Sequence, residues 1–244
     1  MRLVTFNALF KGDVRPRLRA LAEALDHGGF DVACLQEVML RHNLRLLRGY
    51  PYRVASGVLL KDGLVLLSRW PVRRHRFVRY PVSRPVRGEW LMRKGIQLAE
   101  VVTPAGPVAV VNTHLSANRD DDWSPGNRYT RIGARELDRL AAALPATLPL
   151  VVAGDFNLPR NSTVYTRFVA RTGLTDLMAG DSGPTYRPTP AFPSPPALDQ
   201  LLVRGLTGRA ELVLRDAVTL PGGRRAYLSD HYGIAADLTL PAVP

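Results

Sequence analysis

Three short segments of the chain carry carboxylate, carboxamide and imidazole side chains, although they lie far apart in the sequence. They are Asn112-Thr113-His114, Gly154-Asp155-Phe156-Asn157 and Ser229-Asp230-His231. Each follows or adjoins an apolar run typical of a buried strand, so each is expected at a strand end. With Asn7 and Glu37 they form a set of oxygen ligands and two histidines. Such a set suits Mg²⁺ binding and the attack of water on a phosphate ester.

Glu37 is the best candidate metal ligand, because it follows the apolar run 31–35 and a glutamine. The alternative is a favourable charge at the start of a helix beginning at Val38. Asn7 ends the first expected strand; alone it would be a turn or cap residue, but beside Glu37 it offers a second oxygen. We assign Asp230 to the metal as well. Mg²⁺ needs only one or two carboxylates, and Mn²⁺ is the alternative ion.

Asp155 and Asn157 are two residues apart around Phe156. On an extended segment, such side chains face the same way. Both are therefore expected in one pocket, with Phe156 in the core. The alternative is an Asx turn before Pro159.

The two histidines of these segments have different expected roles. His114 follows an apolar strand and suits protonation of a leaving oxygen or stabilisation of charge on phosphate; the alternative is a buried core histidine. For His231 we assign Asp199 as the carboxylate that fixes its tautomer and makes it more basic. With Asp155, His231 would activate water.

Other residues near these segments have two interpretations. Of the adjacent cations Arg93 and Lys94, at most one should enter the pocket, because neighbours on a strand face opposite sides. Three aromatic residues would either contact substrate or cap the core; they are Trp123, Tyr186 and Phe192. Three further histidines are expected at the surface; they are His27, His42 and His75.

Apolar periodicity predicts a chain with more strands than helices. The expected strands are 2–8, 31–36, 52–60, 63–69, 74–80, 91–103, 107–113, 148–153, 198–204, 208–219 and 232–240, and the expected helices are 14–27, 40–47, 128–143 and 162–172. Many strands are apolar on both faces, which favours sheets covered on both sides. Two packed sheets with helices outside would fit, and no linker divides residues 1–244 into two domains.

Composition restricts the partners and the compartment. The net charge is +12, almost all from arginine, which favours an anionic partner such as nucleic acid or a phospholipid surface. The same arginine bias is typical of GC-rich bacterial coding. The single cysteine, Cys34, excludes a disulfide within the chain, and no Cys/His cluster suggests zinc. We find no signal peptide and no apolar run near the ~20 residues of a membrane span, so we expect a cytoplasmic monomer.

Five motifs together resemble one enzyme family. Thr5-Phe6-Asn7, Leu35-Gln36-Glu37-Val38, Asn112-Thr113-His114-Leu115, Gly154-Asp155-Phe156-Asn157 and Ser229-Asp230-His231 resemble, in order, the endonuclease/exonuclease/phosphatase superfamily with the DNase I-like fold. The resemblance implies an α/β protein, a four-layer α/β/β/α sandwich with its site at one rim of the two sheets.

The same resemblance implies roles for the matching residues. The metal would be served by Asn7, Glu37 and Asp230. Water, phosphate and protons would be handled by His114, Asp155, Asn157, Asp199 and His231. Which of Asp155 and His231 is the base stays open.

Within the superfamily, the motifs favour some substrates over others. Abasic-site endonucleases usually carry Tyr-x-Pro-Asn and Ile-Asp-Tyr where this chain has Asn112-Thr113-His114 and Leu198-Asp199-Gln200. The segments Arg93-Lys94-Gly95 and 173–176 look more like those of neutral sphingomyelinases and related bacterial hydrolases. We therefore expect a Mg²⁺-dependent phosphodiesterase acting on nucleic acid or phospholipid. The alternatives are a small-molecule phosphomonoesterase and a non-catalytic basic binding module.

Overall fold

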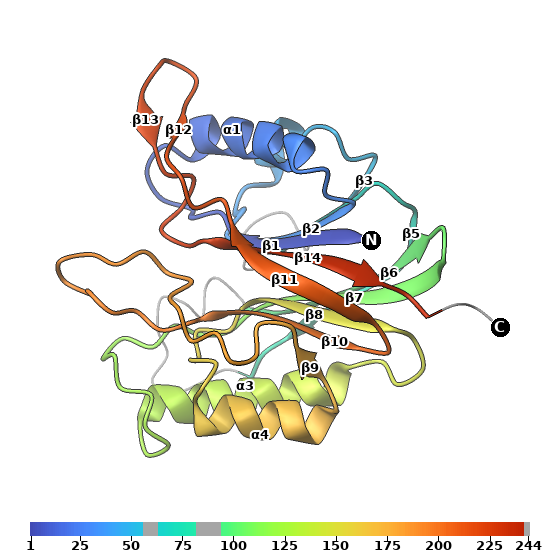
Figure 1. The fold of residues 1–244 in the computed structure, drawn as a ribbon, viewed down its shortest axis with the longest axis vertical. Helices are drawn as coiled ribbons and strands as arrows, with labels where there is room; N and C mark the ends of the chain where they lie inside the picture. The colour runs from blue at the N-terminus through green and yellow to red at the C-terminus, as the bar shows by residue number, and fades with distance from the viewer. Residues whose placement is uncertain (56–62, 82–93, 242–244) are drawn as a thin grey trace.

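Two six-stranded sheets lie face to face in the computed structural model, which describes residues 1–55, 63–81 and 94–241. Helices cover the outer face of each sheet (Figure 1). The first sheet contains β1 (Arg2–Asn7), β2 (Val32–Gln36), β3 (Tyr52–Ala55), β4 (Val65–Ser68), β11 (Thr207–Val213) and β14 (Gly233–Thr239). The second contains β5 (Val72–Arg79), β6 (Gly95–Thr103), β7 (Gly106–His114), β8 (Leu150–Asp155), β9 (Thr175–Asp176) and β10 (Asp199–Arg204). Outside the sheets lie α1 (Val14–His27), the 3₁₀ helix η1 (Arg41–Leu46), α3 (Arg128–Ala143), α4 (Thr163–Thr172) and a hairpin of β12 (Val218–Thr219) and β13 (Arg225–Ala226).

The central strands of both sheets are buried on two faces, whereas the edge strands β3, β5 and β11 are partly exposed. The strand orders are β11-β14-β1-β2-β4-β3 and β5-β6-β7-β8-β10-β9. Along β1, Leu3 packs in the core between the sheets, whereas Val4 packs in the core beneath α1. A third core lies between the second sheet and the helices α3 and α4. The α/β/β/α arrangement explains why so many strands are apolar throughout.

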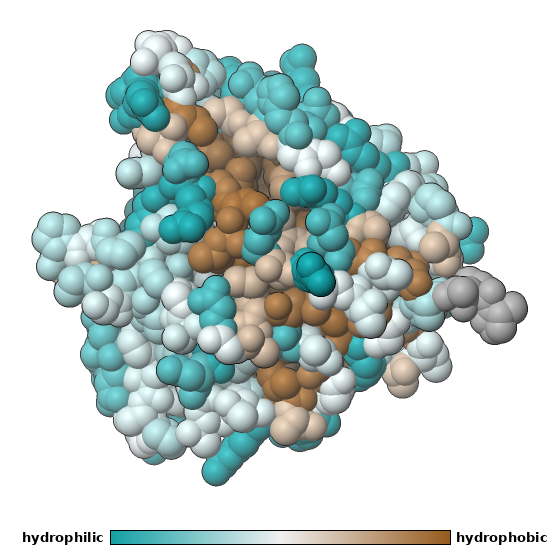
Figure 2. Space-filling model, in the orientation of Figure 1, coloured by the Kyte–Doolittle hydropathy of each residue, from teal (hydrophilic) through white to brown (hydrophobic). Residues whose placement is uncertain are grey.

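The helices follow from amphipathic spacing and local capping. In α1 the side chains of Leu18, Leu21 and Leu25 are buried against the first sheet. The Asn127 side chain caps α3, and the Ser162 side chain caps α4, each by accepting backbone N–H groups. Hydrophilic side chains cover the outer parts of the molecule, and apolar ones gather over its middle layers (Figure 2). The structure thus contains the expected helices 14–27, 128–143 and 162–172 with shifts of at most one residue.

One expected strand is divided. The segment 208–219 forms β11 as far as Val213 and then separates into the β12–β13 hairpin. Leu214 has a φ of 58°, a left-handed conformation that ends the extended run. Parts of two other expected strands, 56–60 and 91–93, lie outside the described residues.

Strand pairing brings the predicted site residues to one edge of the sandwich. In the parallel pair β1–β2, Asn7 lies opposite Gln36. In the parallel pair β7–β8, His114 lies opposite Asp155. Strand β10 runs antiparallel to β8, so its first residue, Asp199, also lies opposite Asp155. Residues distant in sequence thereby become neighbours across strand ends.

Buried amide side chains join the two sheets beneath this edge. Asn112 of β7 accepts a 2.8 Å hydrogen bond from Gln36 of β2 and donates a 3.2 Å bond to Gln97 of β6. It also donates to the backbone carbonyls of Leu35 and Val65. A buried amide is costly unless paired, so this network specifies how the sheets align.

Among the described residues, no helix combines the length and the apolar character needed to cross a bilayer.

Candidate active site

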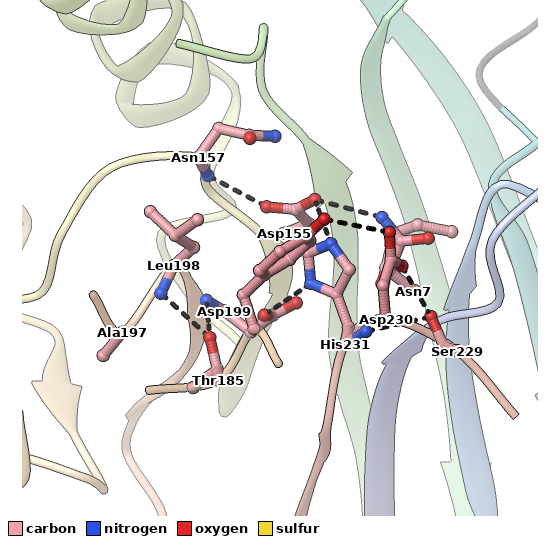
Figure 3. Close-up of polar contacts among 12 residues, drawn as sticks. Asn7, Asp155, Asn157, Thr185, Ala197, Leu198, Asp199, Ser229, Asp230 and His231 are labelled. Atoms are coloured by element: carbon pink, nitrogen blue, oxygen red, sulfur yellow. Dashed lines mark hydrogen bonds and ion pairs between the residues drawn. The ribbon is translucent and has the colours of Figure 1, made fainter. Parts of the chain in front are cut away.

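His231 lies between two buried carboxylates (Figure 3). Its Nδ1 atom is 2.9 Å from Asp199 Oδ2, and its Nε2 atom is 3.8 Å from Asp155 Oδ2. The Tyr186 ring meets the imidazole edge-on at a centroid distance of 5.0 Å. The His231 backbone N–H donates to Ser229 Oγ at 3.1 Å. The imidazole is therefore held with Nδ1 toward one carboxylate and Nε2 toward the other.

Burial and charge decide the protonation states of these three groups. Burial alone lowers the pKa of His231, but Asp199 and Asp155 outweigh it and raise the pKa to about 10. Burial raises the pKa of Asp155, yet the His231 charge and other nearby cationic groups hold it well below its usual range. Burial raises the pKa of Asp199, and His231 offsets only part of that effect. At neutral pH Asp155 is ionised and the metal-free imidazole keeps its proton.

His114 contacts a buried lysine. Its Nε2 atom lies 2.7 Å from Lys94 Nζ and 3.3 Å from Asp155 Oδ2. An ammonium only donates, so the lysine contact requires an unprotonated Nε2, whereas a bond to the carboxylate requires a protonated one. The shorter contact favours donation from Lys94 to a neutral His114. Lys94 also donates to the carbonyl of Leu115 at 2.7 Å; its neighbour Arg93 lies outside the described residues.

Asn157 reaches the site by a turn rather than by strand alternation. Its φ is 50°, and its backbone N–H donates to Asp155 Oδ1 at 3.0 Å. The Asx interaction that we gave as the alternative is thus present, yet both side chains line the same cleft. The side-chain amide of Asn157 donates to the Leu115 backbone carbonyl at 3.0 Å. The backbone carbonyl of Asn157 accepts from Trp123 Nε1 at 3.1 Å.

Gly154 and Phe156 fix the course of this turn. A Cβ atom on Gly154 would lie 1.9 Å from the Thr113 carbonyl oxygen, and its φ is 145°. Only glycine fits such a close approach. Phe156 is fully buried and packs edge-on against Tyr165 and Phe168, as expected for the core side of the segment.

Glu37 and Asp230 face the cleft as partly exposed carboxylates. Glu37 has a φ of 62°, and its Oε2 accepts the Phe10 N–H at 2.9 Å. The helical segment after it begins only at Arg41, so its alternative role at a helix start at Val38 is wrong. Asp230 accepts from Tyr186 Oη at 3.2 Å and from the neighbouring serine hydroxyl at 3.1 Å.

Asn7 lies in the same cleft and contacts Asp155. Its Nδ2 donates to Asp155 Oδ2 at 3.1 Å, and its Oδ1 accepts the Leu9 N–H at 3.1 Å. A carbonyl oxygen has two lone pairs, so this oxygen still has one for a metal.

The donor set of Asn7, Glu37 and Asp230 fits a hard divalent cation. Neither carboxylate forms an ion pair with a cationic side chain in the part of the chain that the structure describes. Two carboxylates and one amide oxygen are ligands that Mg²⁺ prefers. A second group, Asp155, Asp199 and His231, also has its ligand atoms within 4.8 Å of one another. There the imidazole holds a proton between the aspartates, so proton transfer suits this group better than metal binding.

A cleft of about 620 Å³ collects nearly all of the predicted site. Seven of the eight predicted residues line it: Asn7, Glu37, His114, Asp155, Asn157, Asp230 and His231. The eighth, Asp199, is 1% exposed and contacts His231, which lines the cleft.

Aromatic side chains form one wall of the cleft. Trp123 and Phe192 stack at a centroid distance of 6.4 Å, and Tyr186 lies 6.1 Å from Phe192. All three line the cleft, and Trp123 also packs against the core beneath α3. Trp123 therefore caps the core, and its contact with substrate stays a prediction.

A model of the endonuclease/exonuclease/phosphatase family matches residues 4–231, most of the chain. The chain belongs to this family. The expected family membership, and with it the expectation of a hydrolytic enzyme, is confirmed.

Curated relatives of this family member include sphingolipid hydrolases. It is 26% identical over 254 residues to a putative neutral sphingomyelinase of Drosophila melanogaster, covering 93% of this chain and 57% of that protein. It is 28% identical over 174 residues to an inositol phosphosphingolipids phospholipase C of Saccharomyces cerevisiae, covering 63% of this chain and 36% of that protein. The chain thus spans only about a third to just over half of the length of these relatives. Sphingomyelinase-like members are among the matches, as the resemblance implied.

Solved structures confirm the fold of the family domain. The structure of SmcL superposes with a TM-score of 0.77 at 17% identity, covering 97% of this chain and 98% of that one. The expected DNase I-like sandwich is therefore present.

Sequence reasoning missed one residue beside the site of this family member. Arg17 is 5% exposed and lies near the carboxylates of Asp230 and Glu37. It stands four and eight residues before Leu21 and Leu25, on the buried stripe of α1. That helical spacing was the available signal.

Residues expected away from the site lie away from it. His27, His42 and His75 are exposed. Cys34 is fully buried between the sheets, and burial raises the pKa of its thiol to about 12.

Proposed function

We propose that this chain is a divalent-metal-dependent phosphodiesterase that hydrolyses phospholipids of the phosphosphingolipid class. Water would cleave one P–O bond of the diester and release an alcohol and a phosphomonoester. The observation that carries the proposal is the position of His231 between Asp155 and Asp199. The carboxylates of Glu37 and Asp230 line the same cleft. The printed activities of the relatives support the lipid class, and the net charge of +12 supports an anionic partner.

Proton transfer falls to His231 and its two carboxylates. Asp199 accepts the hydrogen bond of His231 Nδ1–H, so Nε2 is the atom that faces Asp155 and the cleft. As an ionised carboxylate, Asp155 orients the attacking water by accepting its hydrogen bond. His231 takes the proton of that water and can return it to the leaving oxygen.

Mg²⁺ held by Asn7, Glu37 and Asp230 would supply positive charge that polarises the phosphate and lowers the pKa of His231. With that pKa at about 10, His231 would otherwise enter the reaction protonated.

Charge on the phosphate oxygens would be stabilised by groups on the second sheet. Lys94 donates to Nε2 of the neutral His114 at 2.7 Å, so His114 holds one fixed positive charge in the cleft beside Asp155. Asn157 presents its side chain to the same cleft from the following turn. Fixed donors in a buried site stabilise developing charge without reorganisation.

Turnover of three substrates by one preparation tests the proposal. Sphingomyelin in mixed micelles, supercoiled plasmid and p-nitrophenyl phosphate would each be assayed against Mg²⁺, with EDTA as a control. We expect Mg²⁺-dependent release of phosphocholine, which His231→Ala lowers by about 10²–10⁴-fold with an unchanged circular dichroism spectrum. A folded His231→Ala protein within tenfold of wild type would contradict the assignment.

A second candidate function is supported by the charge of +12, which also suits a nucleic acid backbone. Plasmid nicking that EDTA and His114→Ala both abolish, without lipid turnover, would make the protein a nuclease. Salt-sensitive binding of DNA or vesicles without any metal-dependent turnover would instead identify a binding module.

A further inference from the structure

One buried guanidinium holds four backbone carbonyls beside the cleft. Arg17 Nη1 donates to the carbonyls of Ala8 at 2.8 Å and Leu228 at 2.7 Å. Arg17 Nη2 donates to the carbonyl of Leu9 at 2.7 Å and to that of Lys11. The guanidinium therefore joins the backbone of residues 8–11 to that of Leu228, more than 200 residues later in the chain.

Those two segments carry or contact all three predicted metal ligands. Residues 8–11 directly follow Asn7, and their backbone N–H groups donate to Asn7 Oδ1 at 3.1 Å and to Glu37 Oε2 at 2.9 Å. Leu228 lies two residues before Asp230. A change at Arg17 would thus be transmitted to each ligand through the backbone.

The charge of Arg17 also matters to the carboxylates. Glu37 and Asp230 are both close enough to interact with the guanidinium electrostatically, yet its hydrogen bonds go to carbonyls. A fixed cation behind two like-charged carboxylates offsets their repulsion while leaving their oxygens turned to the cleft.

We propose that Arg17 is a positioning residue that sets the divalent-metal affinity of the cleft by holding residues 8–11 against the segment before Asp230. The proposal rests on the proposed function in one respect, because it takes Asn7, Glu37 and Asp230 as the ligands. It concerns a side chain that touches neither metal nor substrate. Loss of such supporting contacts typically weakens metal binding about 10–100-fold.

Mn²⁺ binding to the full chain, measured by electron paramagnetic resonance without substrate, tests the proposal directly. The variants are Arg17→Met, which removes charge and hydrogen bonds, and Arg17→Lys, which keeps the charge but cannot reproduce the planar fork. We expect a Kd increase of at least about tenfold for Arg17→Met and a smaller increase for Arg17→Lys.

A matched control separates positioning from general stabilisation. Arg204, at the far end of β10, also donates to two carbonyls, those of Thr172 and Pro145. Arg204→Met should lower Tm and leave the Mn²⁺ Kd unchanged. A purely structural role for Arg17 would give the same pattern: a lower Tm, and a wild-type Kd for the folded fraction.

The outcomes distinguish this proposal from the proposed function. Glu37→Gln is the ligand control and should weaken Mn²⁺ binding. If it does so while folded Arg17→Met binds as wild type, the positioning role is overturned and the metal site stands. If Arg17→Met does not fold, a wild-type Kd in Arg17→Lys overturns the role equally. If wild type binds no Mn²⁺, or Glu37→Gln binds as tightly as wild type, the ligand set itself fails.

Discussion

At the scale of single residues, the chemistry depends on what surrounds one imidazole. His231 is 6% exposed and would be neutral if burial alone acted on it, but two carboxylates reverse that effect. Asp199 fixes which nitrogen carries the proton, and Asp155 lies on the side facing the cleft. Unlike a lone core histidine, His231 therefore has Nδ1 directed at Asp199 and Nε2 directed at Asp155.

Replacing Asp199 with asparagine should show whether the carboxylate is needed to orient His231, because the side chain keeps its size. The carboxamide has almost the same shape as the carboxylate, but it could stabilise the wrong His231 tautomer and would no longer raise the pKa of the imidazole. We expect kcat for Asp199→Asn to fall about 10²–10⁴-fold with KM nearly unchanged. A kcat–pH profile should also show its ionisation at lower pH than in wild type. An unshifted profile with near-normal kcat would remove Asp199 from the mechanism.

The stability of the metal-free protein should decrease at alkaline pH. The pKa of His231 is about 10 in the folded protein and about 6.5 when unfolded, so its stabilising contribution is complete below pH ~6.5 and is lost as pH rises through 10. Thermal unfolding in EDTA between pH 7 and 10 should therefore show a falling Tm, and a shallower fall in His231→Asn. Exposure of Cys34 on unfolding lowers stability in the same range, but equally in both proteins. Parallel curves would exclude the linkage.

At the scale of elements, the site exists because several strands end at the same edge. Parallel pairing of β7 with β8 sets His114 beside Asp155, and the antiparallel start of β10 adds Asp199. Loops after these ends then close the cleft, and the segment from Tyr186 to Phe192 contributes much of its aromatic wall. Strands therefore place His114, Asp155 and Asp199, whereas loops shape the rest of the cleft.

The aromatic wall should act on substrate binding more than on chemistry. Phe192 stacks on Trp123 and contacts Tyr186, and its side chain carries no group that could transfer a proton or bind a metal. We expect Phe192→Ala to raise KM about two- to tenfold and to leave kcat within about a factor of two. Tyr52→Ala, an exposed aromatic on β3 outside the cleft, serves as the control. Equal KM values in Phe192→Ala and wild type would mean that the wall only caps the core.

At the scale of the whole molecule, the cleft depends on the alignment of the two sheets. The first sheet contributes Asn7 and, directly after β2, Glu37, and the second contributes Asp155 and His114. Apolar packing between the sheets is not directional, whereas the amide of Asn112 bonds to both sheets at defined distances. That network thus determines the register of one half of the site against the other. The interpretation of residues 1–244 as one domain stays a prediction.

Asn112→Ala should lower the free energy of unfolding by about 2–4 kcal/mol, because it leaves several buried partners without a hydrogen bond. Urea unfolding followed by circular dichroism would measure the change. Asn43→Ala is the matched control: Asn43 is also buried, but no partner for its Oδ1 is found among the described residues. A similar cost for both variants would show that the bridge contributes nothing specific.

The sequence by itself determined the local features. Periodicity located the helices α1, α3 and α4 to within one residue. The motifs also supplied seven of the eight predicted site residues, and Asp199 was assigned separately as the partner of His231. The structure brings all eight together, although their individual roles stay predictions. These features are readable because each depends on residues within one turn or one strand.

Tertiary structure alone decided the rest. It paired Lys94 with His114 and set Arg17 against carbonyls from both ends of the chain. No local pattern encodes such contacts, since they depend on distances between segments separated by 20 to more than 200 residues. Those distances are fixed only when packing of the two sheets offsets the conformational entropy of bringing the segments together.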